Sequence, residues 1–373
     1  MLPGIDFFTT LIIYILIFLI VTLSYNMAYG YTGIPDFGRA MAAGAGGFLI
    51  GCLPGRLMAY ILGIQGDYVA DSFSIVGRIN LFLKDDPFIS IALLVLTLLL
   101  AAIAGGALGL LASLPIFRGL RLFYLGVTLL AIQIGFNTIA YYWAPLIGGP
   151  LGITVLDPFR WLTNYSLFGV PKASMRLIGV IITSGIVLLI VGYYCIRVGK
   201  SPLGRLLKAV RDDERCAEVL GRDVRKLYVK VMTFTYAFTG VAGALYAYYG
   251  GYVVGTHFDK VGWTFWPVAM VILGGLANYK GTVIATVSFI TLKRLIVFYK
   301  TELEFILPFS PVWLEDLVVG IILVLILIYR PRGLLPEKPE IPLDRDEIEK
   351  IKKRRWSLSP ITSESFKYEK LSK

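Results

Sequence analysis

Long apolar runs alternate with shorter polar segments along most of the chain. Predominantly apolar runs cover residues 7–28, 88–112, 122–142, 175–194, 231–250 and 313–329. A helix needs about 20 apolar residues to cross the hydrocarbon core of a bilayer, so each run predicts one membrane span. The first run has no basic segment before it and is too long for a signal peptide, so it also counts as a span.

A broken segment, residues 26–51, follows the first span. Gly30, Gly33 and Pro35 interrupt its backbone, and small residues at 42–47 offer a face that another helix can approach closely. Irregular backbone at membrane depth is tolerated only against protein or a water-lined cavity. The segment is therefore a candidate for a translocation pathway, and plain helix packing is the alternative.

A second long apolar stretch, residues 263–298, exceeds the length of one span. The turn at 278–281 divides it into an inward and an outward half. With both broken segments counted, the sequence predicts an all-α polytopic membrane protein of about nine transmembrane helices, eight to ten if a broken segment re-enters. Residues 54–87 and 143–174 are mixed in polarity and predict external loops.

Small residues recur every four positions on two predicted spans and indicate close helix packing. These stripes are Ala101, Gly105, Gly109 and Gly243, Ala247, Gly251. On another span, Gln133 and Asn137 lie one helical turn apart. Amides within a span either bond to neighbouring helices or line a solute path, and both interpretations stay open.

A polar stretch at residues 197–230 carries twice as many basic as acidic residues. Lys and Arg near span ends are retained in the cytoplasm, so the loop and the basic turn at Arg118 and Arg121 predict the inner side. By the count of spans, the N-terminus then lies outside and the C-terminus inside.

The same stretch carries signals for an ordered helix pair. Ser201 and Pro202 predict a helix start, the pair at 212–213 predicts an interruption that caps a second helix, and Gly221 predicts its end. An amphipathic helix pair beside a membrane lies on anionic lipid or docks against a soluble partner, and both interpretations stay open.

The composition indicates a membrane protein, and the distribution of charge argues against a nucleic acid partner. Of all residues 57% are hydrophobic and 16% are charged, and the mean hydropathy is +0.73. The formal net charge of +11 is concentrated in residues 197–230 and in the tail, as membrane topology requires, so we expect no nucleic acid partner. The tail, residues 337–373, has no apolar periodicity and predicts a largely disordered cytoplasmic segment after a permease domain at 1–336.

Few residues are available for catalysis or metal binding. Three widely separated cysteines and one histidine, His257, support neither a metal site nor a nucleophile system, and we expect no cofactor. No Asp, Glu, Lys, Arg or His falls in the middle of a predicted span, so no device for coupling to an ion gradient is evident. The sequence GKS at 199–201 lacks the first glycine of a P-loop, so any ATP is hydrolysed by another subunit.

Five blocks of sequence carry a resemblance to a known family. They are NMAYGYTGIPDFG at 26–38, FRGLRLFYLGVTLLAIQI at 117–134, SPLGRLLKAVRDDERCAEVLG at 201–221, VILGGLANYKGTVIAT at 271–286 and YRPRGLLP at 329–336. With these blocks in this order, the chain resembles the permease subunits of branched-chain amino acid ABC importers, the hydrophobic amino acid uptake family. The resemblance covers about residues 20–336.

The resemblance implies an ABC importer permease fold, a second permease subunit, two ATPase subunits and an external solute-binding protein. The loop would be the coupling helix received by a cleft in the ATPase, and an amino acid would pass at the permease interface within the membrane lipid. The candidate coupling residues are Arg205, Arg211, Glu214, Ala217, Leu220 and Gly221. The candidate pathway residues are Asn26, Tyr31, Thr32, Gly33, Gln133 and Asn137.

Departures from the family pattern leave the solute open. Residues 34–36 and Arg39 differ from the residues common in the family, and Arg215-Cys216-Ala217 stands where an acid and two alanines are typical. Branched-chain or other hydrophobic amino acids are the first expectation, and urea or short amides are the alternative within the family. A stand-alone channel or secondary carrier is the alternative from another class, and an enzyme is disfavoured.

Overall fold

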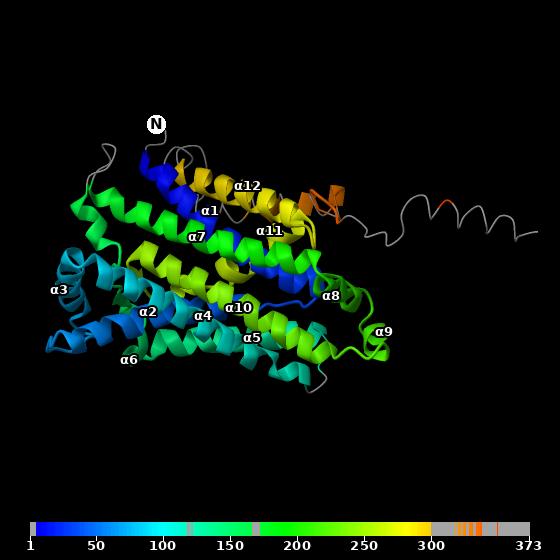
Figure 1. Cartoon of the computed structure of the whole chain (residues 1–373), viewed down its shortest axis with the longest axis horizontal. Coiled ribbons are helices and arrows are strands. Elements are labelled where there is room, and N and C mark those ends of the chain that lie inside the picture. The colour runs from blue at the N-terminus through cyan, green and yellow to red at the C-terminus, as the bar shows by residue number, and fades with distance from the viewer. Residues whose placement is uncertain are drawn as a thin grey trace, which may run out of the picture. The chain divides into compact units, whose positions relative to one another are not determined.

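The computed structural model describes residues 5–117, 120, 122–165, 172–299, 317, 320–321, 324–325, 328–330, 333–337 and 349. The chain divides into two compact units, Met1–Pro336 and Glu337–Lys373. Arg118, Arg121, most of the predicted span at 313–329 and nearly all of the tail lie outside the described residues. All the helices labelled in Figure 1 belong to the first unit.

Helices make up almost all of the described chain. They are α1 (Ile5–Tyr25), η1 (Asn26–Gly30), α2 (Arg39–Ile61), α3 (Ser72–Asp85), α4 (Pro87–Phe117), α5 (Leu122–Tyr142), α6 (Ala144–Ile147), η2 (Gly149–Leu151), η3 (Arg160–Asn164), α7 (Lys172–Lys200), α8 (Pro202–Asp212), α9 (Glu214–Val219), α10 (Val224–Gly250), η4 (Gly255–Phe258), η5 (Val261–Phe265), α11 (Trp266–Gly274) and α12 (Tyr279–Phe298). The strands β1 (Ile153–Thr154) and β2 (Tyr252–Val253) form one antiparallel pair, Ile153 opposite Val253 and Thr154 opposite Tyr252.

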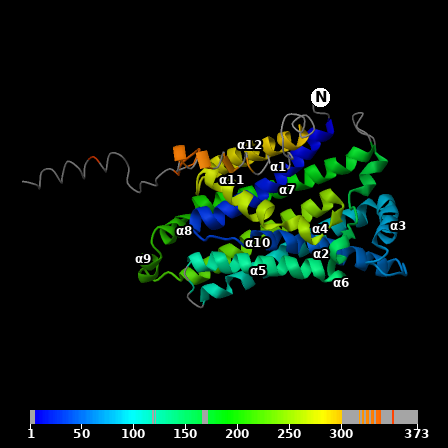
Figure 2. The same cartoon turned by 180° about the vertical axis from the view of Figure 1, so that it is seen from behind.

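The long helices of the first unit run side by side, as Figures 1 and 2 show from opposite sides. α8 and α9 lie at one end of the bundle, whereas α3 and α6 lie at the other (Figure 1). The β1–β2 pair joins the segment after α5 to the segment after α10. The loop that carries α8 and α9 thus lies at the opposite end of the bundle from α3 and α6.

Six helices are long and apolar enough to cross a membrane. They cover Asp6–Gly30, Arg39–Ile61, Pro87–Phe117, Phe123–Tyr142, Ser174–Lys200 and Tyr279–Phe298. The prediction of an all-α multi-pass membrane protein is confirmed at this level. The count of nine is not reached among the described residues, because α11 has 9 residues and the Thr, Tyr and Gly residues of α10 make it less apolar.

α10 forms the centre of the bundle and packs against α4, α2, α1 and α7. A methyl group added at Gly46 would overlap the carbonyl oxygen of Gly240, and one at Gly105 would lie 2.5 Å from the carbonyl oxygen of Tyr236. A methyl group at Gly243 would likewise overlap the carbonyl oxygen of Ala43. The predicted small-residue faces thus allow three helix backbones to approach closely.

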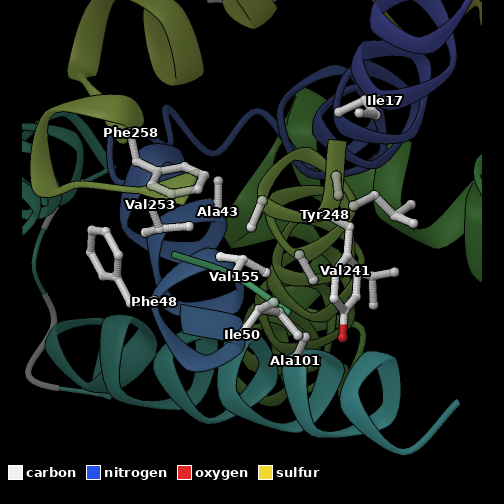
Figure 3. Packing of buried hydrophobic residues seen from close by; sticks show 14 of the residues in the cluster. Ile17, Ala43, Phe48, Ile50, Ala101, Val155, Val241, Tyr248, Val253 and Phe258 are labelled. Carbon is white, nitrogen blue, oxygen red and sulfur yellow. The ribbon is translucent and has the colours of Figure 1, made fainter. Parts of the chain in front are cut away.

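Apolar side chains from several helices meet around α10. Figure 3 shows Ile17 from α1, Ala43 from α2, Ala101 from α4 and Val241 from α10 converging. All four belong to one cluster of buried residues. Dispersion contacts in such a tight core hold the helices together where lipid offers no hydrophobic gain.

The prediction of a loop over residues 54–87 is wrong, whereas the external side of this segment stays a prediction. α2 continues to Ile61, and α3 covers Ser72–Asp85. Ile75, Ile79 and Leu83 of α3 are buried, with the spacing of four that one face of a helix requires. The acidic residues at the ends of this stretch concealed the helical period.

Candidate functional sites: the basic loop and the buried polar segment

α8 begins where the sequence predicts. The Ser201 hydroxyl accepts a hydrogen bond from the Gly204 amide at 3.4 Å, and Pro202 is the first helical residue. Proline suits this position because its fixed φ fits the helix and its missing N–H would have no partner there. α8 ends at Asp212, as predicted.

The start of α9 is capped by a carboxylate. Asp213 Oδ1 accepts hydrogen bonds from the amides of Arg215 at 3.0 Å and Cys216 at 3.1 Å. These bonds, that from the Cys216 amide first, lower the pKa of the Asp213 carboxyl. The Cys216 thiol donates to the same carboxylate at 3.3 Å, which raises the pKa of the thiol. The predicted cap at Asp213 is confirmed.

α9 ends in a glycine turn. Gly221 has a φ of 78°, a backbone conformation that glycine adopts without the penalty of a Cβ atom. Its amide donates to the Glu218 carbonyl at 2.9 Å, and the Arg222 amide donates to the Ala217 carbonyl at 3.1 Å. This is the Schellman pattern of a helix end, and it confirms the predicted stop.

The α8–α9 loop has a buried face and an exposed apolar tip. Leu207 is 0% and Ala217 is 5% exposed, whereas Val219 is 87% and Leu220 is 80% exposed. Arg205, Glu214 and Gly221 also lie on the exposed side. Covering two neighbouring aliphatic side chains would gain free energy, so the tip suits contact with another surface.

The loop contacts the broken segment directly. Arg211 Nη1 donates a hydrogen bond to the Gly30 carbonyl at 2.8 Å, and Lys208 Nζ lies 5.4 Å from the centre of the Tyr31 ring. A methyl group at Gly33, where φ is 74°, would lie 3.1 Å from Arg211 Cγ. Arg211, a predicted coupling residue, thus lies against the predicted pathway residue Gly33, and Lys208 of the same loop lies near Tyr31.

The segment after α1 breaks as predicted, with regular helix resuming at Arg39. Asn26 is 0% exposed, and its Oδ1 accepts from the Ala277 amide at 2.9 Å. The Thr32 hydroxyl donates to the Ala28 carbonyl. The Tyr31 ring stacks on Tyr279 with centroids 5.4 Å apart. Side-chain bonds and ring contacts therefore hold this irregular backbone against its neighbours.

The sequence analysis missed a buried ion pair in this segment. Arg39 Nε lies 3.0 Å from Asp36 Oδ2, and both side chains are 0% exposed. The Tyr236 hydroxyl donates to Asp36 Oδ1 at 2.7 Å, and Arg39 Nη1 donates to the Thr239 hydroxyl at 3.1 Å. Tyr236 and Thr239 lie near the middle of α10, so the prediction of no ionisable residue at mid-span is wrong. Opposite charges three residues apart in an apolar context were the available signal.

Aromatic rings enclose the Arg39 guanidinium. Its central carbon lies 5.0 Å from the centre of the Tyr25 ring and 5.1 Å from that of Tyr236. Desolvated cation–π contacts of this kind offset part of the cost of burying a charge. Asp36, Arg39 and Tyr236 together form the buried polar network that fixes the entry into α2.

The two span amides bond to neighbouring elements. Gln133 is 0% exposed and accepts from the Thr264 hydroxyl at 3.1 Å, while that hydroxyl accepts from the Ala40 amide at 3.0 Å. Asn137 Nδ2 donates to the Phe258 carbonyl at 2.5 Å. These bonds agree with the first of the two interpretations, in which the amides fasten α5 to η4, η5 and α2.

The candidate pathway residues fall into two sets. Asn26, Tyr31, Thr32 and Gly33 lie on η1 and the break beside α8, whereas Gln133 and Asn137 lie on α5. In the described part of the chain, no three His, Cys, Asp or Glu residues lie together as metal ligands. Many polar groups of the core thus bind each other and the backbone, whereas Asn26 Nδ2, Gln133 Nε2 and Asn137 Oδ1 are buried without a hydrogen-bond partner among the described residues.

Comparison with known proteins places the chain in a family. The family model described as "Branched-chain amino acid transport system / permease component" matches residues 7–327. A probable branched-chain amino acid transport permease protein LivM of Methanocaldococcus jannaschii is 34% identical over 352 residues, which are 91% of this chain and 96% of that protein.

Two bacterial proteins are more distant. High-affinity branched-chain amino acid transport system permease proteins LivM of Salmonella typhimurium and Escherichia coli are 27% and 26% identical over 264 residues, 65% of this chain and 58% of theirs. No solved structure matches the chain. These matches confirm the family resemblance and the prediction of a transport component rather than an enzyme. The chain belongs to the family of permease components of branched-chain amino acid transport systems.

Proposed function

We propose that this permease moves branched-chain or other hydrophobic amino acids into the cell as part of an ATP-driven importer. The family description and the names of the relatives support this solute class. In the proposed assembly the chain pairs with a second permease subunit, two ATPase subunits drive transport, and an external protein delivers the solute. The chain itself needs no cofactor.

The proposed orientation follows from charge. The end of the bundle that carries α8 and α9 holds the basic stretch at residues 197–230, which the positive-inside rule assigns to the cytoplasm. The N-terminus then lies outside and the C-terminus inside the cell membrane. Counting α10, α11 and the segment at 313–329 with the six candidate spans gives the nine proposed spans.

The contact between Arg211 and Gly30 carries the proposed mechanism. Val219 and Leu220 would enter a cleft of an ATPase subunit, with Arg205 and Glu214 at the rim of that contact. Movement of the ATPase would shift α8, and Arg211 would transmit the shift to the backbone between Gly30 and Arg39. An irregular segment moves more readily than a helix because fewer backbone hydrogen bonds must break.

The same contact supports the proposed translocation pathway. The break contains glycine backbone and buried polar side chains, which resemble the discontinuous helices that bind solutes in other transporters. We assign Asn26, Tyr31, Thr32 and Gly33 to the inner part of the path, and Gln133 and Asn137 to groups that shape its wall.

The first test concerns docking. Leu220→Asp, in the full chain coexpressed with its transporter partners, should abolish copurification of the ATPase subunits, because a charge replaces the apolar tip. Leu151→Asp is the matched control, and it should leave ATPase binding unchanged. Leu151 is 84% exposed on η2, which packs against α6, and α6 lies at the opposite end of the bundle (Figure 1). Undiminished ATPase binding by Leu220→Asp would contradict the proposed docking site.

The second test separates docking from transmission. Arg211→Gln should retain the ATPase subunits but reduce uptake of radiolabelled leucine about tenfold or more, since a charge-assisted hydrogen bond is lost. Arg222 is an exposed basic residue of the same loop, and Arg222→Gln should retain both the ATPase subunits and the normal rate of leucine uptake. Leucine uptake by the purified chain in liposomes without ATPase would instead support a channel or carrier. Uptake of urea rather than leucine by the assembled transporter would support urea or short amides as the solute.

A further inference from the structure

A cavity of about 430 Å³ lies between α1, η5 and α12. Its volume falls within the range of about 300–1,000 Å³ that is typical of small-molecule sites. Tyr246, at the late end of α10, and Lys293, near the end of α12, both line it. In the proposed orientation this places the cavity near the external side, away from the loop and the break.

Charges of both signs line this cavity. Lys293 and Arg294 reach it from α12, and Asp259 reaches it from the segment between η4 and η5. The Arg294 guanidinium lies over the Tyr14 ring, and the Lys293 ammonium lies over the Trp266 ring. Both cations also line the cavity, so an anionic ligand group bound there would be able to form charge-assisted hydrogen bonds with them.

The acid of the cavity is held in place by the backbone. Asp259 Oδ2 accepts from the Val261 amide at 2.9 Å and the Gly262 amide at 3.1 Å. Both bonds use Oδ2, and Asp259 is an exposed residue. A fixed carboxylate on the same cavity as two cations suits a ligand that carries both charges.

The rest of the wall is aromatic. Phe18 is 4% and Trp263 is 3% exposed, and their rings stack with centroids 5.5 Å apart. Buried aromatic surface favours an aliphatic group and gives no partner to a polar one. An aliphatic amino acid requires three features of its binding site. These are cations that face its carboxylate, a carboxylate that faces its ammonium group and an apolar wall that contacts its side chain.

We infer that this cavity is an external binding site for a free zwitterionic amino acid with an aliphatic side chain, with Lys293 and Arg294 facing its carboxylate and Asp259 facing its ammonium group. The inference rests on the proposed function for its solute class. It adds a solute site that is separate from the buried polar network and from the α8–α9 loop. A phospholipid phosphate is also an anion that Lys293 and Arg294 would attract. Binding of a phosphate, however, gives no reason for a carboxylate such as Asp259 on the same cavity.

The test is direct ligand binding to the full chain in nanodiscs, in the absence of other subunits. Saturation-transfer NMR with leucine should show saturable binding, with the methyl groups receiving most transfer because they lie against the rings. Arg294→Gln should weaken leucine binding about tenfold or more. Lys280→Gln, an exposed lysine at the opposite end of the same helix, is the matched control and should bind like the unaltered chain.

Two ligand analogues test the charge pairing. Leucinamide lacks the carboxylate and should compete about tenfold less well than leucine with the unaltered chain, and this preference should disappear in Arg294→Gln. N-acetylleucine lacks the ammonium group, and its disadvantage should disappear in Asp259→Asn, a variant that retains the oxygen bonded to the Val261 and Gly262 amides.

Absence of saturable leucine binding to the unaltered chain, or unweakened leucine binding by both Arg294→Gln and Asp259→Asn, would overturn the inference. A phospholipid that copurifies with the unaltered chain but not with Arg294→Gln, together with no leucine binding, would overturn it in favour of a lipid anchor. Failure of the assembled transporter to take up leucine would overturn the proposed function instead, whichever result the nanodisc experiment gives.

Discussion

Two helix interruptions in this permease differ in how their polar groups are bonded and in how much surface they expose. The break between η1 and α2 is buried, and its Asp36–Arg39 pair bonds to Tyr236 and Thr239 of α10. The interruption between α8 and α9 is capped by Asp213, but the turn that follows exposes Val219 and Leu220. The first is bonded within the chain, whereas the second presents an exposed apolar surface.

The largest effect should come from breaking the internal network. Arg39→Met leaves the Asp36 carboxylate buried without its partner, which should cost about 3–5 kcal/mol of unfolding free energy. Thermal unfolding in detergent measures this loss. The double variant Asp36→Leu, Arg39→Met removes both charges and should recover most of it, because the pair itself contributes little net stability. A double variant as unstable as the single one would show that the network does more than neutralise Asp36.

A smaller effect should distinguish the glycines of the two interruptions. Gly33→Ala and Gly221→Ala each force an alanine into positive φ, at a cost of about 1–2 kcal/mol. At Gly33 the added methyl group also meets Arg211 Cγ at 3.1 Å, whereas at Gly221 it meets nothing within 4 Å. The melting temperature should therefore fall more for Gly33→Ala. Gly221→Asn, which tolerates this conformation, should behave like the unaltered chain.

A still smaller effect is expected at the exposed tip. Leu220→Ser should change the unfolding free energy of the isolated chain by less than about 0.5 kcal/mol, since the side chain is already in contact with solvent. Leu207→Ala, in the same loop but buried, should cost about 2–5 kcal/mol. Chemical denaturation of both variants gives the comparison, and a large loss for Leu220→Ser would mean that the tip packs within the chain.

The smallest effect concerns the cap of α9. The amides of Cys216 and Arg215 lower the pKa of Asp213 in the folded chain, so its stabilising contribution is present above its ordinary pKa of about 3.9 and is lost as pH falls through the lowered value. The protection of the α9 amides against hydrogen exchange, measured relative to the intrinsic exchange rate at each pH, should therefore fall below about pH 4. Asp213→Asn keeps a capping oxygen without a titrating group and should show no such loss of protection.

Local signals in the sequence were sufficient for the α8–α9 loop. Ser201, Asp213 and Gly221 act within four residues along the chain, so their roles follow from spacing alone. The helical period of α3 was equally local and was overlooked because acidic residues flank it. By contrast, the partners of Gln133 and Asn26 lie 131 and 251 residues away, and no local pattern indicates them.

Long-range pairing also decided how two of the family motifs, the blocks at residues 271–286 and 329–336, meet. The Leu334 amide donates to the Leu273 carbonyl at 2.8 Å, and Asn278 Nδ2 donates to the Leu335 carbonyl at 3.0 Å. The sequence identified both motifs as parts of a family pattern. Their contact became visible only in the folded chain, because α12 and the segment after it separate them along the sequence.

The sequence by itself determined the membrane class, the long apolar helices, the capped helices of the basic loop and the family, because hydropathy, capping and motif order are properties of neighbouring residues. Only the tertiary structure decided that Asp36 and Arg39 form a buried pair, that Arg211 bonds to Gly30, and that Lys293, Arg294 and Asp259 share one cavity. Each of these depends on which helix faces lie together, and that choice is made by packing in the folded chain.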